Sequence, residues 1–146
     1  MNCKSQKGIT MLSLVIYVAC FVIIASIIGA ITAFFYNNTE LLSSEAYSAT
    51  EYNKLNIYLV NESEEVGNSF VDFDNTGSLY KLTFSNGNVY TFDTENNLLY
   101  FNQICLCEDV QDLKVTTDYT TGKEVIKVKI DFSNKSYTTS YTMDNV

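Results

Sequence analysis

The stretch ITMLSLVIYVACFVIIASIIGAITAFFY, residues 9–36, decides the fold of this chain. It runs for 28 residues without a charged side chain, whereas about 20 apolar residues are enough to cross a bilayer as a helix. Lipid offers no hydrogen-bond partners, so a spanning segment must satisfy its own backbone groups, and its many β-branched residues do not argue against a helix. The stretch therefore predicts a membrane-spanning helix over residues 9–36.

Charges are distributed unevenly around this helix. Lys4 and Lys7 precede it, and all 17 acidic residues lie at or after Glu40. Beyond Tyr36, seven lysines accompany 17 acidic residues, a formal charge of −10. Positive residues favour the cytoplasmic side, so we expect a single-pass protein of the cytoplasmic membrane with its N-terminus inside and its C-terminal part outside. Nucleic acid would be repelled by so acidic a domain, and no such contact is expected.

The composition offers little for catalysis. The chain has no histidine, which is the commonest general base and a common metal ligand. Glu62, Glu64 and Glu65 form an acidic cluster, but carboxylates at a helix end are expected on a solvated surface. We therefore expect no enzyme and no cofactor, because a membrane-tethered hydrolase would require a pocket with perturbed carboxylates.

Residues 37–66 predict a continuation of the helix as an amphipathic segment. They contain no glycine or proline, and apolar side chains recur at three- and four-residue steps. Gly67 and Asn68 indicate where the helix stops. The expected apolar stripe consists of Leu41, Leu42, Ala46, Ala49, Tyr52, Leu55 and Leu59. The charged residues expected mostly off this stripe are Glu40, Glu45, Glu51, Lys54 and Glu62.

After Gly67 the period of the apolar residues changes to two, which predicts strands. Asn86-Gly87 predicts a hairpin between a strand over 80–84 and its return through Tyr90 and Phe92. Further strands are expected over 98–104, 113–119, 126–132 and 137–143. Residues 67–146 are therefore predicted to form one antiparallel meander with an apolar face. The fold class is α+β, with one long N-terminal helix packed on an antiparallel sheet.

One loop has a weak resemblance to a calcium site. Asp72, Asp74 and Thr76 stand at the first, third and fifth positions of an EF-hand pattern with Gly77 at the sixth, but the twelfth position is Thr83 instead of glutamate. A turn with Asx-type hydrogen bonds and a positive φ at Gly77 explains the same residues. We expect the turn, with calcium binding as the alternative.

Two cysteines belong to the acidic part of the chain. Cys105 and Cys107 lie two residues apart, so on a regular strand they would point to the same face, too far apart for an easy disulfide. We expect two small apolar side chains there. A strained or intermolecular disulfide, or a metal site, is the alternative.

The run KGITMLSL, residues 7–14, resembles the type IV prepilin signal, in which a short basic leader ends in glycine and an apolar helix begins directly. The resemblance implies a leader over residues 1–8, carrying Lys4 and Lys7, and cleavage by a prepilin peptidase between Gly8 and Ile9 with methylation of Ile9. Family members usually carry glutamate at the fifth mature residue, where this chain has Ser13. This departure implies a minor or initiating subunit instead of a shaft-forming one.

The resemblance further implies a pilin-like fold and a minor pilin or pseudopilin assembled through its N-terminal helix. The filament would serve a type IV pilus, type II secretion, DNA uptake (competence) or adhesion, and the partners would be the prepilin peptidase and other pilin or pseudopilin subunits. Small residues are expected at helix contacts. They are Ala25, Ser26, Gly29, Ala30 and Ala33. The alternative function is a single-pass, signal-anchored extracytoplasmic binding domain, which would keep its leader.

Overall fold

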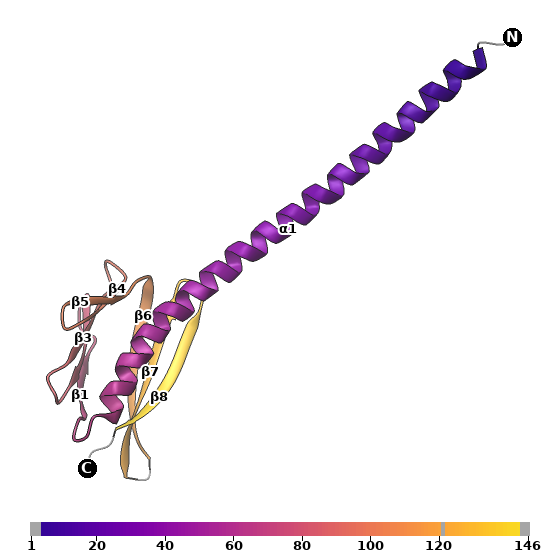
Figure 1. Ribbon diagram of the computed structural model, residues 1–146. Coiled ribbons are helices and arrows are strands. Elements are labelled where there is room, and N and C mark those ends of the chain that lie inside the picture. The colour runs from indigo at the N-terminus through magenta and orange to yellow at the C-terminus, as the bar shows by residue number, and fades with distance from the viewer. Residues whose placement is uncertain (1–3, 121, 144–146) are drawn as a thin grey trace. The chain divides into compact units, whose positions relative to one another are not determined.

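The structure is a computed structural model that describes the backbone of residues 4–120 and 122–143 and the side chains of residues 11–119 and 122–143. Contacts divide the chain into two compact units, Met1–Ser43 and Ser44–Val146. A single helix, α1 (Lys4–Glu64), begins in the first unit and ends in the second (Figure 1). The predicted long N-terminal helix is confirmed.

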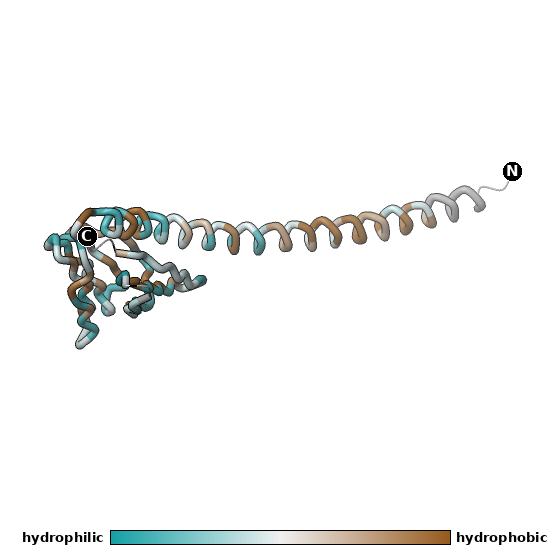
Figure 2. The backbone as a smooth tube through the Cα atoms, turned by 90° about the horizontal axis from the view of Figure 1, so that it is seen from below, coloured by the Kyte–Doolittle hydropathy of each residue, from teal (hydrophilic) through white to brown (hydrophobic). Residues whose placement is uncertain are grey.

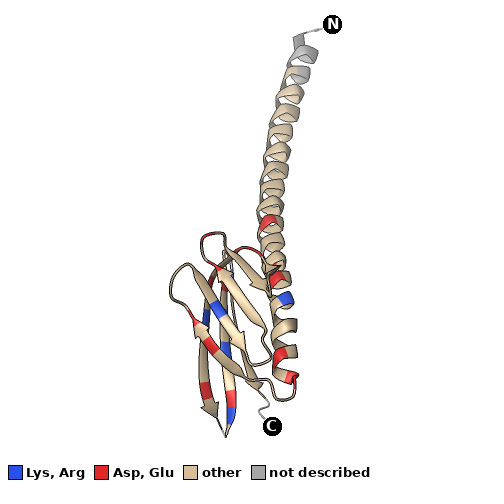
Figure 3. Cartoon of the chain, turned by 90° about the vertical axis from the view of Figure 1, so that its left-hand side faces the viewer, with Lys and Arg blue, Asp and Glu red and all other residues tan. Residues whose placement is uncertain are grey.

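The first unit consists of the apolar part of α1. Figure 2 shows an almost unbroken run of hydrophobic residues along it. Among the residues whose side chains are described, the first charged one is Glu40, and Figure 3 shows charged residues on the later part of the helix, on the strands and on their connections. An 18-residue window of this helix has a mean hydropathy of 2.9. By length and composition the helix is able to cross a membrane, which is compatible with a single-pass anchor.

The end of α1 is fixed by its capping residues. Gly67 adopts a φ of 78°, a left-handed conformation that glycine takes without steric cost. The side chain of Asn68 then folds back and donates from Nδ2 to the carbonyl oxygen of Glu62, at 3.1 Å. One of the carbonyl groups that a helix leaves unpaired at its C-terminus is thereby satisfied. The predicted helix stop is confirmed.

Eight strands follow the helix, and they form two antiparallel sheets. The first has the order β1-β2-β3-β4-β5 and the second the order β6-β7-β8, so the prediction of one continuous meander is wrong. The strands of the first sheet are β1 (Phe70–Asp74), β2 (Leu79–Phe84), β3 (Val89–Asp93), β4 (Leu98–Phe101) and β5 (Ile104–Cys107). Those of the second are β6 (Val110–Thr120), β7 (Lys123–Phe132) and β8 (Ser136–Met143).

The sheets separate at the short connection between β5 and β6. Asp109 has a φ of 59° there, so the chain turns sharply before β6 begins. The backbone N–H of Val110 donates to the carbonyl of Asn97 at 3.0 Å, which ties the start of β6 to the β3–β4 turn. Nothing in the alternating pattern of the strands distinguishes this turn from an ordinary hairpin connection.

One core lies between the last turns of α1 and the two sheets. Leu55 and Leu59 of the helix are 2% and 3% exposed. They join one buried cluster with inward-facing side chains of both sheets, among them Phe92 of β3 and Ile130 of β7. The predicted packing of an amphipathic helix on antiparallel strands is confirmed. The second unit therefore has a single hydrophobic core shared by all three layers.

The buried stripe of the helix differs from the expected one. Leu41 and Leu42 are 55% and 65% exposed. Glu51 and Glu62, expected mostly off the stripe, are only 3% and 4% exposed. The side chains of α1 that are buried in the second unit are Ser48, Glu51, Leu55, Leu59 and Glu62. Their three- and four-residue spacing is the period of one helix face, which therefore includes two carboxylates.

The run 98–104 is not one strand but two. Asn102 and Gln103, with φ values of 45° and 76°, form a two-residue turn between β4 and β5. Two consecutive positive φ values are typical of the tight turn whose twist matches an antiparallel hairpin. Sequence analysis missed the turn because glycine usually occupies its second position, where this chain has Gln103.

A β-bulge separates the environments of the two cysteines. Tyr100 pairs with Cys105 but Leu99 pairs with Cys107, so one extra residue is accommodated in β5. Cys105 is exposed and Cys107 is buried. The prediction that both face the same way is wrong, because an inserted residue shifts the alternation of side chains by one.

Candidate functional site

The largest candidate functional surface is the apolar part of α1. Every Leu, Ile, Val, Met, Phe and Tyr side chain between Met11 and Tyr36 is at least 50% exposed. Soluble proteins rarely expose contiguous apolar patches larger than a few hundred Å², and larger ones mark contact with a membrane or a partner. This surface is therefore built to be covered by lipid or by other helices.

Four polar side chains in and just after the apolar part of α1 donate hydrogen bonds to the helix's own backbone. Ser26 donates to the carbonyl of Val22 at 2.7 Å, and Thr32 donates to that of Ile28 at 2.9 Å. Nearer the second unit, Asn38 and Thr39 donate in the same way to carbonyls four residues earlier, each at 2.8 Å. Such back-bonding satisfies a polar side chain in apolar surroundings without a partner from outside the helix.

The residues of the prepilin-like signal lie at the start of α1. The helix runs from Lys4 without a break through Gly8 and Ile9. The side chains of Lys4, Lys7, Gly8 and Ile9 lie outside the described part of the chain, so cleavage at Gly8–Ile9 stays a prediction. Ser13 is the first residue of functional interest with a described side chain, and it is exposed on the helix.

The small residues expected at helix contacts lie within this exposed surface. A Cβ added at Gly29 would meet no atom within 4 Å. Packing within the described chain therefore does not require glycine there. Small residues such as glycine are common where membrane helices pack closely.

The second notable arrangement is a buried carboxylate at the C-terminal end of α1. Oε2 of Glu62 accepts hydrogen bonds from the side-chain amides of Asn68 and Asn86, both at 2.7 Å. Oε1 accepts from the amide of Asn88 at 2.8 Å and from the hydroxyl of Tyr90 at 3.1 Å. Burial first, and then the negative charge of Glu62, raises the pKa of Tyr90, which keeps that hydroxyl a donor.

The network around Glu62 corrects the prediction of a wholly solvated acidic cluster. A buried carboxylate is stable when donors surround it, and here four side chains from the helix end and the β2–β3 hairpin supply them. Glu64 and Glu65 are exposed, as expected. The arrangement presents no free carboxylate oxygen for acid–base chemistry, so it acts as a clamp between helix and hairpin.

A second buried carboxylate, Glu51, holds α1 to the connection after β5. Its Oε2 accepts from the backbone N–H of Glu108 at 3.0 Å, and its Oε1 accepts from Lys54 at 2.6 Å. The thiol of Cys107 donates to the backbone carbonyl of Glu51 at 3.1 Å. The helix is therefore fixed to the five-stranded sheet near both ends of its packed stripe.

The other side of the same helix segment contacts the three-stranded sheet. Tyr52 stacks on Tyr137 with ring centroids 4.4 Å apart and an interplanar angle of 6°, and its hydroxyl hydrogen-bonds Thr139. Asn56 accepts from the hydroxyl of Tyr141 at 2.7 Å. These contacts complete a helix held by polar groups on both flanks and by leucines in between.

The predicted turn after β1 is confirmed. Asp74 accepts from the backbone N–H of Thr76 at 2.9 Å and from its hydroxyl at 2.6 Å, and Gly77 has a φ of 97°. These hydrogen bonds lower the pKa of Asp74. Asp72 lies within β1, opposite Thr83. Because Thr76 donates to Asp74 in this turn, the described residues give the calcium alternative no support.

The polar clamps were not predicted from the sequence, although part of the signal for them is present in it. Glu51 and Glu62 share the helical period of Leu55 and Leu59, which was the available signal. Read locally, Asn86-Gly87 predicts only the turn of a hairpin, and Asn88 follows it. The side-chain amides of both asparagines are also the donors that a buried carboxylate requires, but pairing them with a residue 24 positions earlier needs the tertiary structure.

The two environments of the cysteines predict a difference in reactivity. Burial raises the pKa of the Cys107 thiol to about 12, and the thiolate is the reactive form. In folded protein, N-ethylmaleimide is expected to modify Cys105 at least about tenfold faster than Cys107, as followed by peptide mass spectrometry. After denaturation both should react alike. Equal rates in the folded protein would contradict the buried position of Cys107.

No family model, no curated protein and no solved structure matches this chain. Its architecture, one long apolar N-terminal helix followed by β-sheets, is compatible with that of the pilins. The features that bear on function are the apolar helix, the signal at its start and the packed unit at its end.

Proposed function

We propose that this protein is a minor pilin or pseudopilin. It is processed by a prepilin peptidase between Gly8 and Ile9, stays in the cytoplasmic membrane through residues 9–36, and enters a filament by packing this helix against those of other subunits. The filament belongs to a type IV pilus, type II secretion or DNA-uptake system. Its globular unit lies outside the cytoplasm.

The observation that carries the proposal is the exposed apolar surface of α1 together with its continuity into a packed unit. A plain anchor needs only about 20 apolar residues. Here 61 residues form one helix, and its last turns are part of the hydrophobic core. The apolar segment that would contact other subunits and the segment that packs in the globular unit therefore belong to the same helix.

The side chains of the apolar segment are compatible with both surroundings that the proposal requires, lipid before assembly and other helices after it. From Met11 to Tyr36 no charged group would have to be moved between the two surroundings. Helices in membranes associate through close packing of small residues, and Gly29 has open space around it. Ser13 supplies no carboxylate at the fifth mature position, which supports a minor subunit over a shaft-forming one.

Processing is the direct test. Full-length protein is expressed in membranes with and without a prepilin peptidase, and the N-terminal peptide is measured by mass spectrometry. We expect a peptide beginning at Ile9 only when the peptidase is present. A Gly8→Leu variant is expected to keep its leader in both samples, because a side chain at this position obstructs an extended protease site.

Retention of Lys4 and Lys7 in all samples would contradict the pilin proposal. The protein would then be the alternative, a single-pass signal-anchored domain that presents a binding unit outside the cell. Cleavage in the absence of the peptidase would point to a different protease and would also count against the proposal.

A further inference from the structure

The turn of the β2–β3 hairpin contains the one Asn-Gly step of this sequence, Asn86-Gly87. Asparagine is a thermolabile residue, and its side-chain amide is lost most readily when glycine follows, because glycine has no side chain to obstruct the backbone nitrogen. Asn86 is exposed, and a Cβ added at Gly87 would meet no atom within 4 Å. Water therefore reaches this step, and no neighbouring atom crowds it.

Deamidation at this step is a reaction between two groups of the turn itself. The backbone nitrogen of Gly87 attacks Cγ of Asn86. A bond forms between these two atoms, the bond from Cγ to Nδ2 breaks, and ammonia leaves with the proton of the Gly87 N–H. Water then opens the cyclic imide, which leaves aspartate or isoaspartate at position 86. The reaction needs no reagent other than water.

In the folded protein both ends of the Asn86 amide are held. Its Nδ2 donates to Oε2 of Glu62 at 2.7 Å and to Oε2 of Glu65 at 2.6 Å. Its Oδ1 accepts from the backbone N–H of Asn88 at 2.9 Å. Hydrogen bonds to carboxylates are stronger than those between neutral groups. Ring closure onto Gly87 therefore requires that the amide first leaves both glutamates.

The attacking nitrogen is engaged as well. The N–H of Gly87 donates to the carbonyl of Phe84 at 3.1 Å. The nucleophile in deamidation is the deprotonated amide, and a hydrogen bond donated by the neutral form disfavours its deprotonation. The turn thus holds both reacting groups in unreactive states.

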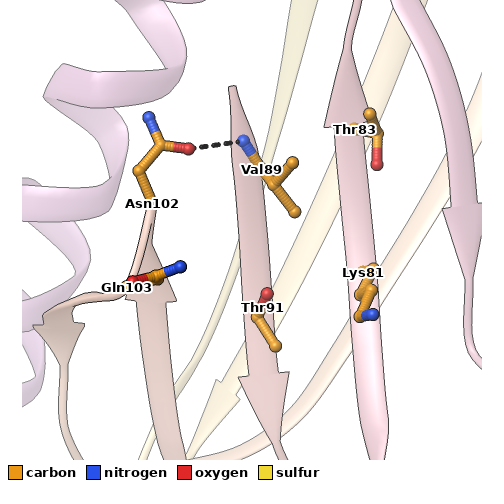
Figure 4. Close-up of a pocket in the computed structure, with 6 residues that line it drawn as sticks. All are labelled: Lys81, Thr83, Val89, Thr91, Asn102 and Gln103. Carbon is orange, nitrogen blue, oxygen red and sulfur yellow. Dashed lines mark hydrogen bonds between the residues drawn. The ribbon is translucent and has the colours of Figure 1, made fainter. Parts of the chain in front are cut away.

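The other side of the hairpin is fixed by the β4–β5 turn. Oδ1 of Asn102 accepts from the N–H of Val89 at 2.9 Å, as Figure 4 shows at the start of β3. The backbone N–H of Asn102 donates to the carbonyl of Val89 at 2.9 Å, and its Nδ2 donates to Asn88 at 2.8 Å. Release of the Asn86 amide is therefore expected on the side of α1, where Glu65 is exposed.

We propose that Asn86 is a deamidation site that the carboxylates of Glu62 and Glu65 protect in the folded protein. Deamidation replaces the amide donor by a carboxylate, so a third negative charge stands beside those of the two glutamates. Charges of the same sign at such short distances repel each other, and the clamp between α1 and the hairpin is weakened. The loss of ammonia makes the change irreversible. This inference does not depend on filament assembly.

Protection is tested with full-length protein in detergent micelles, incubated in mildly alkaline buffer while peptide mass spectrometry follows the conversion of Asn86. The folded protein is expected to convert at least about tenfold more slowly than the same protein in concentrated urea, because reaction requires local opening. Glu65→Ala should convert about threefold faster or more, since one hydrogen bond to the amide is lost. Glu64→Ala, on the same helix turn, should convert like the parent protein.

The effect of the modification is tested with Asn86→Asp, which carries one of its products. Asn86→Ala is the matched control, because it removes the donor without adding a charge. We expect the thermal midpoint of Asn86→Asp to lie about 2–5 °C below that of Asn86→Ala. In about 1 M salt the difference should shrink, since the Debye length falls to about 3 Å.

Four outcomes would overturn the proposal. They are an Asn86 that stays intact in urea, equal conversion in the folded protein and in urea, a Glu65→Ala protein that converts no faster than Glu64→Ala, and an Asn86→Asp protein as stable as Asn86→Ala.

Discussion

Replacement of Glu62 by alanine is expected to lower the free energy of unfolding by about 3–5 kcal/mol, the cost of disrupting a buried charged network. Glu62 is 4% exposed and accepts four side-chain hydrogen bonds. Without its carboxylate, the amides of Asn68 and Asn88 and the hydroxyl of Tyr90 are left as buried or half-buried donors, whereas the exposed Asn86 still donates to Glu65. Urea denaturation followed by tyrosine fluorescence measures the loss.

The neighbouring glutamate provides the control. Glu64→Ala removes an exposed carboxylate of the same helix turn and should change the denaturation midpoint little. Glu62→Gln, which keeps the shape but replaces one acceptor by a donor, should fall between the two. A Glu62→Ala protein as stable as Glu64→Ala would show that the hairpin donors find other partners and that Glu62 does not clamp the hairpin to the helix.

Replacement of Leu55 by alanine is expected to cost about 2.5–5 kcal/mol. Leu55 is 2% exposed and belongs to the core cluster that includes side chains of both sheets. Truncation leaves a cavity between three rigid layers, and such a site collapses poorly because the strands are fixed by their hydrogen bonds. The midpoint of urea denaturation should shift while its slope remains unchanged.

Two residues further along the helix, Ile57 is 59% exposed and offers a matched truncation. Ile57→Ala is expected to stay within about 0.5 kcal/mol of the parent protein, as surface substitutions usually do. Equal losses for Leu55→Ala and Ile57→Ala would mean that the packed face of α1 is assigned incorrectly. The comparison therefore tests the orientation of the helix as well as the value of the contact.

The parts of the fold that were predictable from sequence are those with a strong local signal. The charge-free run of residues 9–36, the stop at Gly67 and the hairpin at Asn86-Gly87 each depend on neighbouring residues alone. The strand over 126–132 was equally clear, because Lys127 and Lys129 alternate with buried apolar residues in β7. In each case one period or one turn residue carries enough information.

The parts that were missed depend on contacts between distant residues. The change from one sheet to the next occurs at Asp109, whose positive φ has no signal as strong as glycine. The β4–β5 turn was missed because Gln103 occupies a glycine position, and the bulge in β5 because alternation there is shifted by a single residue. The burial of Glu62 follows from three asparagines and a tyrosine that only the folded chain brings to it.

The candidate functional features also fall into those that local sequence predicts and those that only the folded chain shows. The prepilin-like signal at Gly8 and Ile9 is a feature of sequence, and its cleavage remains a prediction that the fold leaves open. The clamp around Glu62 is a feature of structure. Its four donors follow the helix end or belong to the β2–β3 hairpin, and no spacing in the sequence marks them as one cluster.

The hydroxyls of α1 that donate to carbonyls of the same helix affect the specificity with which this helix can pack against other helices. Because Ser26 and Thr32 already donate to Val22 and Ile28 of their own helix, a change of surroundings from acyl chains to another helix breaks none of these bonds and forms no new ones. The preference for one neighbouring helix over another must then come from the shape complementarity of the packed side chains. Packing of this kind involves no titratable or charged group. The affinity between such helices should therefore depend on bilayer thickness and side-chain volume, and hardly on pH or ionic strength.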